Sequence, residues 1–181
     1  MIPEQWIIEA QSRISDHILN TPIIHDQNTG AFLKCENRQK TGSFKLRGAL
    51  NKIIGLHDWE ITPGLVTASA GNHGLGVALA SQAVGASATV FVSKDAVPLK
   101  VDAIRSYKAE INYITGTYGD VEKAGIDYAK QSGRTWISPY NDGQVIAGQG
   151  TIAIEIITQK PSLLEATWVV PVGGGGLISG I

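Results

Sequence analysis

The chain has 181 residues, of which 43% are hydrophobic and 17% charged, as in an ordinary soluble globular protein. Its formal net charge of -1 gives no reason to expect nucleic acid or an anionic membrane as a partner. The single cysteine, Cys35, excludes an internal disulfide and fits a reducing compartment. The first nineteen residues mix acids into an apolar pattern, so we expect neither a signal peptide nor a membrane span, and we expect a cytoplasmic protein.

The first third of the chain predicts two helices and a strand. Apolar residues at helical spacing before Pro22 predict an amphipathic helix that ends at this proline. Residues 31–35 are typical of a short strand. Residues 44–54 return to helical spacing, with Ser43 as a plausible N-cap.

From there on, predicted strands and helices alternate. The strands are expected at residues 64–68, 88–92, 111–114, 135–137 and 167–172, and the helices at 72–83, 98–107, 120–131 and 150–158. Alternation with short links favours parallel strands with helices on both faces of the sheet, so the fold class is α/β.

A run of four glycines, Gly173–Gly176, lies between the last predicted strand and a predicted helix start at Leu177. Consecutive backbone N–H groups in such a loop can converge on an anion, assisted by the helix dipole. No lysine follows in the phosphate-loop pattern, and the spacing is not that of a dinucleotide-binding loop. A single phosphate monoester is therefore favoured over ATP or NAD, and a tightly packed turn is the alternative.

Lys45 lies just inside a predicted helix start, next to the aromatic Phe44. A helix N-terminus is a poor place for a permanent cation, but it suits a lysine engaged in an imine with an aldehyde cofactor. The alternative is a solvated surface lysine, which is what most lysines are.

Residues 67–74 form another strand-to-helix turn of small residues. The helix start can bind a carboxylate through backbone N–H groups. The alternative is that Ser69 or Asn72 simply caps the helix, and both roles are compatible. His73 could be a structural or an acid–base histidine.

Together, these three segments resemble the fold-type II pyridoxal-phosphate enzymes, specifically the serine/threonine dehydratase group that includes serine racemase. The resemblance covers nearly the whole chain in the family's order. It implies that Lys45 forms the Schiff base with pyridoxal 5'-phosphate and that Phe44 packs against this cofactor. Asn72 would bond the phenolic oxygen of the cofactor. The phosphate would be held by Gly173, Gly174, Gly175, Gly176 and Leu177, and the substrate carboxylate by the turn of Ser69, Ala70, Gly71, Asn72 and His73.

The resemblance also implies a two-lobed architecture. Residues 1–50 and 141–181 would form part of a larger, cofactor-anchoring domain, and residues 51–140 a smaller α/β domain. Family members are considerably longer, so the chain is expected to be truncated at the C-terminus. The residue that bonds the pyridine nitrogen would lie in the missing part, and no metal ligand is assigned.

The implied function is a dehydratase that converts L-threonine or L-serine to a 2-oxo acid and ammonia. One alternative is an inactive fragment or half-enzyme that needs its C-terminal part. Another is an amino-acid racemase of the same fold, but Ala70 stands where serine racemases carry a second serine as the acid–base group. A small-molecule amino acid is the expected partner, and a homodimer is one assembly open to such a protein.

Overall fold

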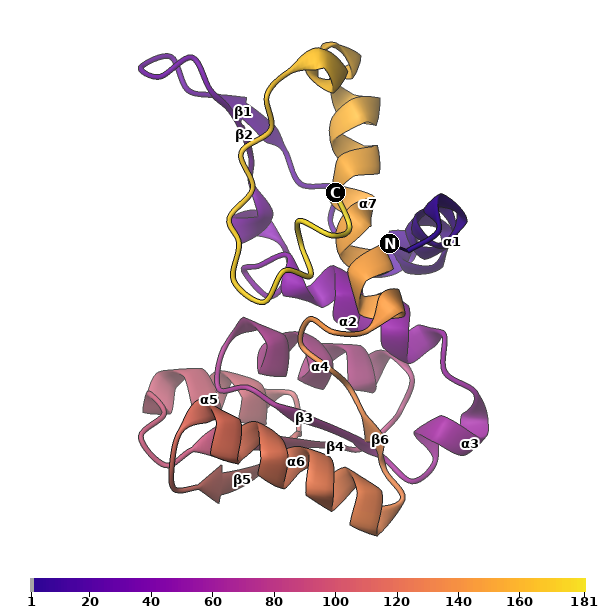
Figure 1. The fold of residues 1–181 in the computed structure, drawn as a ribbon, viewed down its shortest axis with the longest axis vertical. Helices are drawn as coiled ribbons and strands as arrows, with labels where there is room; N and C mark the ends of the chain where they lie inside the picture. The colour runs from indigo at the N-terminus through magenta and orange to yellow at the C-terminus, as the bar shows by residue number, and fades with distance from the viewer. Residues whose placement is uncertain (1) are drawn as a thin grey trace.

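The computed structural model describes residues 2–181 and confirms the α/β class. Figure 1 shows a sheet with its helices in one part and the helices α1, α2 and α7 with a hairpin in the other. The helices are α1 (Glu4–Ile14), α2 (Lys45–Ile54), α3 (Asp58–Ile61), α4 (Asn72–Ala83), α5 (Pro98–Ser106), α6 (Tyr118–Ser132) and α7 (Gly143–Gln159), with short 3-10 helices at Ser15–His17, Glu36–Arg38 and Pro161–Glu165. The strands are β1 (Ile23–His25), β2 (Phe32–Lys34), β3 (Leu65–Ala68), β4 (Ala88–Ser93), β5 (Glu110–Ile114) and β6 (Thr135–Trp136).

The main sheet has four parallel strands in the order β5-β4-β3-β6. Leu65 of β3 pairs with Ala88 of β4 on one side and with Thr135 of β6 on the other. Because all four strands run the same way, their carboxyl ends meet at one edge of the sheet. This edge is where an α/β fold places ligands.

Helices cover both faces of this sheet, as predicted. Val90 and Val92 of β4 pack in a core cluster with α4 and α5. Phe91, between them, packs with α6 instead. Alternate residues of a strand point to opposite faces, so α4 and α5 cover one face and α6 covers the other.

Helix α2 lies between α4 and α7 (Figure 1). It approaches α7 so closely that a Cβ built on Gly148 would lie 2.6 Å from the Cα of Gly48. The two glycines therefore allow backbone-to-backbone contact where the helices cross. This crossing fixes the start of α2 relative to α7.

The start of α7 differs from the sequence-based prediction. The predicted helix began at residue 150, but α7 begins at Gly143, capped by the side chain of Asp142, which accepts from the N–H groups of Gln144 and Val145. Glycines normally argue against a helix. Here Gly148 is required by the close contact with α2, so tertiary packing outweighs its low helix propensity.

The predicted N-cap of α2 was also wrong. The N-cap is Phe44, whose backbone is already helical at φ -63° and ψ -19° and whose side chain has no atom that could accept a capping bond. The hydroxyl of Ser43 is buried and has no hydrogen-bond partner among the described residues.

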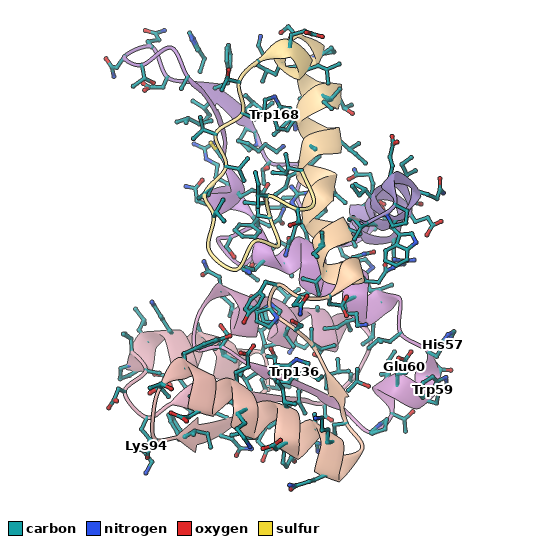
Figure 2. All side chains as sticks on the ribbon, viewed as in Figure 1. His57, Trp59, Glu60, Lys94, Trp136 and Trp168 are labelled. Atoms are coloured by element: carbon teal, nitrogen blue, oxygen red, sulfur yellow. The ribbon has the colours of Figure 1, made fainter. Side chains whose placement is uncertain are left out.

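The strand predicted at residues 167–172 is wrong as well. The segment is irregular and largely exposed, with Val169 92% exposed, because no described strand lies beside it to complete its hydrogen bonds. Figure 2 shows Trp168 between this segment and α7, and its indole N–H donates to the carbonyl of Leu163 at 2.7 Å. The helix expected after the glycines is only a series of turns over residues 176–180.

Within residues 2–181, no helix combines the length and the apolar character that crossing a bilayer requires.

Candidate active site

Lys45 and the four-glycine loop, 128 positions apart at their nearest, line one cavity of about 400 Å³. This volume is within the range of small-molecule sites in proteins. Its lining consists of Phe44, Lys45, Pro171, Val172, Gly173, Gly174, Gly175, Gly176 and Leu177. The structure therefore brings together an amine and a glycine-rich loop that the sequence predicts separately.

The amine of Lys45 is held at the wall of this site. Lys45 is the first residue of α2, and its Nζ donates to the carbonyl oxygen of Pro139 at 2.7 Å. The Nζ atom also lies 5.3 Å from the ring centre of Phe44. Burial lowers the pKa of the Lys45 amine, because desolvation disfavours its charged form. A lowered pKa increases the fraction of the amine that is neutral at a given pH, and the neutral amine is the form that acts as a nucleophile or takes a proton.

The glycine loop packs on Tyr140, the residue after Pro139. A Cβ built on Gly174 would lie 2.6 Å from Cγ of the Tyr140 ring, and one on Gly176 would lie 3.2 Å from the Tyr140 backbone. Gly175 has φ +85°, a conformation that favours glycine. Cβ atoms on Gly173 or Gly175 would meet no other atom within 4 Å. The loop is thus close-packed on one side and open on the other, as a cradle for a phosphate group requires.

The turn of Ser69–His73 leads into α4, which begins at Asn72, and the turn is not part of the cavity lining. Its shape is fixed by the hydroxyl of Ser69, which accepts from the N–H of Gly71 at 3.2 Å. Asn72 is exposed and is the first residue of α4, whereas Ala70 is half-buried. The N-cap is Gly71, so neither Ser69 nor Asn72 occupies the N-cap position, but the Ser69 hydroxyl satisfies the N–H of Gly71 at the helix start.

Helix α4 nevertheless brings this turn close to the lysine. A Cβ on Gly76 would lie 3.3 Å from the backbone carbonyl of Lys45. His73 is buried, and its Nε2 lies 3.3 Å from the carbonyl of Ile137, two residues before Pro139. A carbonyl can only accept, so Nε2 carries the hydrogen. Burial lowers the pKa of His73 to about 4, and the charge of Lys45 contributes to this shift. The imidazole is therefore neutral at neutral pH and has a structural contact.

A buried ion network holds α2 in place beside the site. Arg47 is fully buried, and its guanidinium donates to Glu36 at 2.8 Å and to Glu155 of α7 at 2.6 Å. Lys34 adds a second contact to Glu155 at 2.6 Å. These bonds keep the pKa of Glu155 below its usual value against the opposing effect of burial. The guanidinium of Arg47 thus has two acidic partners.

The sequence-based reasoning missed Pro139 and Tyr140. Both lie in the short segment between β6 and α7, which leaves the sheet at its carboxyl edge, and this position is the signal that could have identified them. Residues 2–181 contain no group of three or more His, Cys, Asp or Glu side chains that could hold a metal ion.

Comparison with known proteins places this geometry in a family. The family model described as "Pyridoxal-phosphate dependent enzyme" matches residues 14–181. The chain is 37% identical to an L-threonine ammonia-lyase of Geobacter sulfurreducens, over all of this chain and 46% of that protein. It is 38% identical to a serine racemase of Arabidopsis thaliana, over 97% of this chain and 54% of that protein.

Solved structures of related enzymes have the same fold as this chain. A serine racemase from maize superposes with a TM-score of 0.92 at 36% identity, covering 97% of this chain and 55% of its own. A threonine deaminase isoform 2 from Solanum lycopersicum gives a TM-score of 0.88 at 33% identity, covering 97% and 50%. The chain spans about half the length of the curated relatives that it matches. The predicted family and cofactor are confirmed: this chain belongs to the pyridoxal-phosphate dependent enzymes.

Proposed function

We propose that the protein containing this chain is a dehydratase that converts L-threonine or L-serine to a 2-oxo acid and ammonia. The observation that carries the proposal is the shared cavity of Lys45 and the glycine loop. An amine at one wall and a phosphate cradle at another suit a phosphorylated aldehyde. The similarity to L-threonine ammonia-lyases at 37% and 41% identity supports this choice of reaction.

The residues fit pyridoxal 5'-phosphate in two respects. The lowered pKa of Lys45 favours the neutral amine that reacts with an aldehyde. The missing side chains of the glycine loop leave room for phosphate oxygens at backbone N–H groups, and Gly173–Gly176 with Leu177 would hold them. When bound, the cofactor supplies an electron sink for the charge that forms at the substrate α-carbon.

Lys45 is assigned the central proton transfer. Its neutral amine would take the proton from the α-carbon of the amino acid, and burial favours this neutral form before the transfer. Phe44 would exclude water on the side where its ring faces Nζ. The β-hydroxyl then leaves as water after it receives a proton, which the protonated Lys45 amine can return, so the reaction is an elimination.

The turn of Ser69–His73 is assigned to the substrate carboxylate. It stands at the N-terminus of the 12-residue helix α4, where backbone N–H groups and the helix dipole favour an anion. Asn72 would bond the phenolic oxygen of the cofactor. The turn does not line the cavity in the present structure, so we infer that the substrate lies between the cavity and the turn.

A racemase is the second candidate, because serine racemases are among the relatives. Ala70 weighs against it, since a methyl group cannot exchange a proton on the face of the substrate opposite Lys45. An alanine here favours elimination, which needs a base on one face only.

We also infer a two-lobed arrangement, with residues 51–140 as the smaller lobe and residues 1–50 and 141–181 in the larger. Helix α2 spans the boundary, because it runs from Lys45 to Ile54. The cavity would then lie where the two lobes meet. A homodimer is part of the same proposal.

The experiment is an activity assay on the full-length protein loaded with pyridoxal phosphate, with L-threonine, L-serine and D-serine as separate substrates. We expect 2-oxo acid and ammonia in equal amounts from an L-amino acid, and none from a K45A variant. Interconversion of L- and D-serine without ammonia would instead establish the racemase. If the 181-residue chain is inactive where the full-length protein is active, this chain is a half-enzyme.

A further inference from the structure

Tyr140 packs against the glycine loop at positions 174 and 176, whereas positions 173 and 175 face open space. A Cβ at position 174 would lie 2.6 Å from Cγ, 2.7 Å from Cδ1 and 3.0 Å from Cβ of Tyr140. At position 176 the added Cβ would lie 3.2 Å from the Cα and the carbonyl oxygen of the same residue. Real Cβ atoms do not approach other atoms as closely as 2.6 Å, so the ring of Tyr140 explains why glycine stands at position 174.

The same ring is tied to the sheet part of the molecule. Its hydroxyl lies 3.3 and 3.5 Å from the two carboxylate oxygens of Glu122 in α6. Burial and the Glu122 carboxylate raise the pKa of Tyr140, so the phenol remains protonated and donates to Glu122. Burial and the Glu122 carboxylate also raise the pKa of Tyr118, at the start of α6, to about 12.

The main chain before Tyr140 completes the connection. The carbonyl of Pro139 accepts the hydrogen bond from Lys45, and the next residue packs against Gly174. One short segment thus contacts both the amine and the phosphate cradle. A shift of the Tyr140 ring would move the loop relative to Lys45.

We propose that Tyr140 is a positioning residue that gives the glycine loop the shape needed to hold a phosphate group, and that Glu122 fixes the Tyr140 ring from α6. This inference rests on the proposed function, because it assigns the phosphate to this loop. Tyr140 acts through the loop and is not itself assigned to the reacting atoms.

The test uses the full-length protein and two aldehydes, pyridoxal phosphate and pyridoxal, which differ only in the phosphate. The quantity measured is the ratio of the two dissociation constants, obtained from absorbance titrations. A change in overall stability affects both aldehydes alike, whereas a change in the loop affects only the phosphorylated one. Thermal melting of each variant without aldehyde is recorded alongside.

The key variants are G174A, Y140A and the double variant. We expect G174A to reduce the preference for pyridoxal phosphate by about tenfold or more, since the new methyl group collides with the ring. In the Y140A background, where the ring is gone, G174A should cause little additional loss.

The bond to Glu122 is tested by Y140F and E122Q. Y140F keeps the ring and removes the hydroxyl, so a loss of about threefold in the preference is expected. E122Q keeps an acceptor and should lose less. G119A, in α6 but with only one ordinary contact at 3.7 Å, should leave the preference unchanged.

Two results would overturn the inference. One is an unchanged preference for pyridoxal phosphate in G174A, and the other is a full additional loss from G174A in the Y140A background. Failure of the proposed function has a different signature, namely no adduct of either aldehyde on Lys45 in the unmodified protein.

Discussion

The Nζ atom of Lys45 donates a 2.7 Å hydrogen bond to the carbonyl oxygen of Pro139, which joins the start of α2 to the segment between β6 and α7. Residues 94 positions apart in sequence thus define one wall of the site. The hydrogen bond orients the Lys45 side chain, and burial lowers the pKa of its amine.

The amine of Lys45 should react at lower pH than an exposed lysine, because burial lowers its pKa. Lys123 is a matched control, since it is exposed and its pKa is raised by Asp127. Reductive methylation across a pH series, quantified by mass spectrometry and scaled to the plateau of each site, should give a lower midpoint for Lys45. Equal midpoints, or the reverse order, would contradict this environment.

The buried ion network around Arg47 should be important for stability. R47M leaves the carboxylates of Glu36 and Glu155 without their main partner, and breaking a buried pair costs about 3–5 kcal/mol. Urea unfolding measures this loss. R105A is the control, because Arg105 and Asp102 form an exposed pair, and it should change the free energy of unfolding by less than about 1 kcal/mol. Equal effects of the two variants would show that the network is not stabilising.

The buried His73 predicts a pH dependence of stability. Its pKa is about 4 in the folded protein and about 6.5 in an unfolded chain, so between these values the unfolded state binds the additional proton. The stability that depends on a neutral His73 is fully present above pH 6.5 and is lost as the pH falls to about 4. Relative to H73Q, the free energy of unfolding should decrease by about 3 kcal/mol over this interval. Parallel pH curves for the two proteins would argue against a buried neutral imidazole.

The crossing of α2 and α7 should not tolerate a methyl group. A Cβ on Gly148 meets the backbone of Arg47 and Gly48 at 2.6 Å, and overpacking of this kind costs about 1–3 kcal/mol. The matched variant G119A, in the open first turn of α6, should instead stabilise the protein by roughly 0.5 kcal/mol. Chemical denaturation of both variants decides the point, and a neutral G148A would mean that the helices can separate without cost.

The sheet could be predicted from the sequence because its central strands are apolar and buried. Val90 and Val92 mark one covered face and Phe91 the other, and the helices between strands carry ordinary helical spacing. Strand β1 was missed because it has only three residues, two of them exposed, and depends on pairing with β2 rather than on burial. The first two turns of α7 were missed because Gly148 and its neighbouring glycines lower the apparent helix propensity.

The site, like the fold, could be predicted from the sequence only in part. Lys45 and the glycine loop could be found because their chemistry is carried by their own residue types in short motifs. Pro139 contributes only a backbone carbonyl, and Tyr140 contributes a ring packed against residues more than thirty positions later. Neither contact leaves a local pattern. The roles assigned to Ser69 and Asn72 remain predictions, since the turn that carries them lies beside the cavity lining.

The most direct test of the central claim is the covalent attachment of pyridoxal phosphate. The full-length protein would be incubated with the cofactor, reduced with borohydride and digested, and the modified peptide identified by mass spectrometry. If Lys45 is the cofactor-binding lysine, we expect a single reduced adduct on Lys45, which is lost in K45A while folding is retained. An adduct on another lysine, or no adduct on a folded full-length protein, would contradict it.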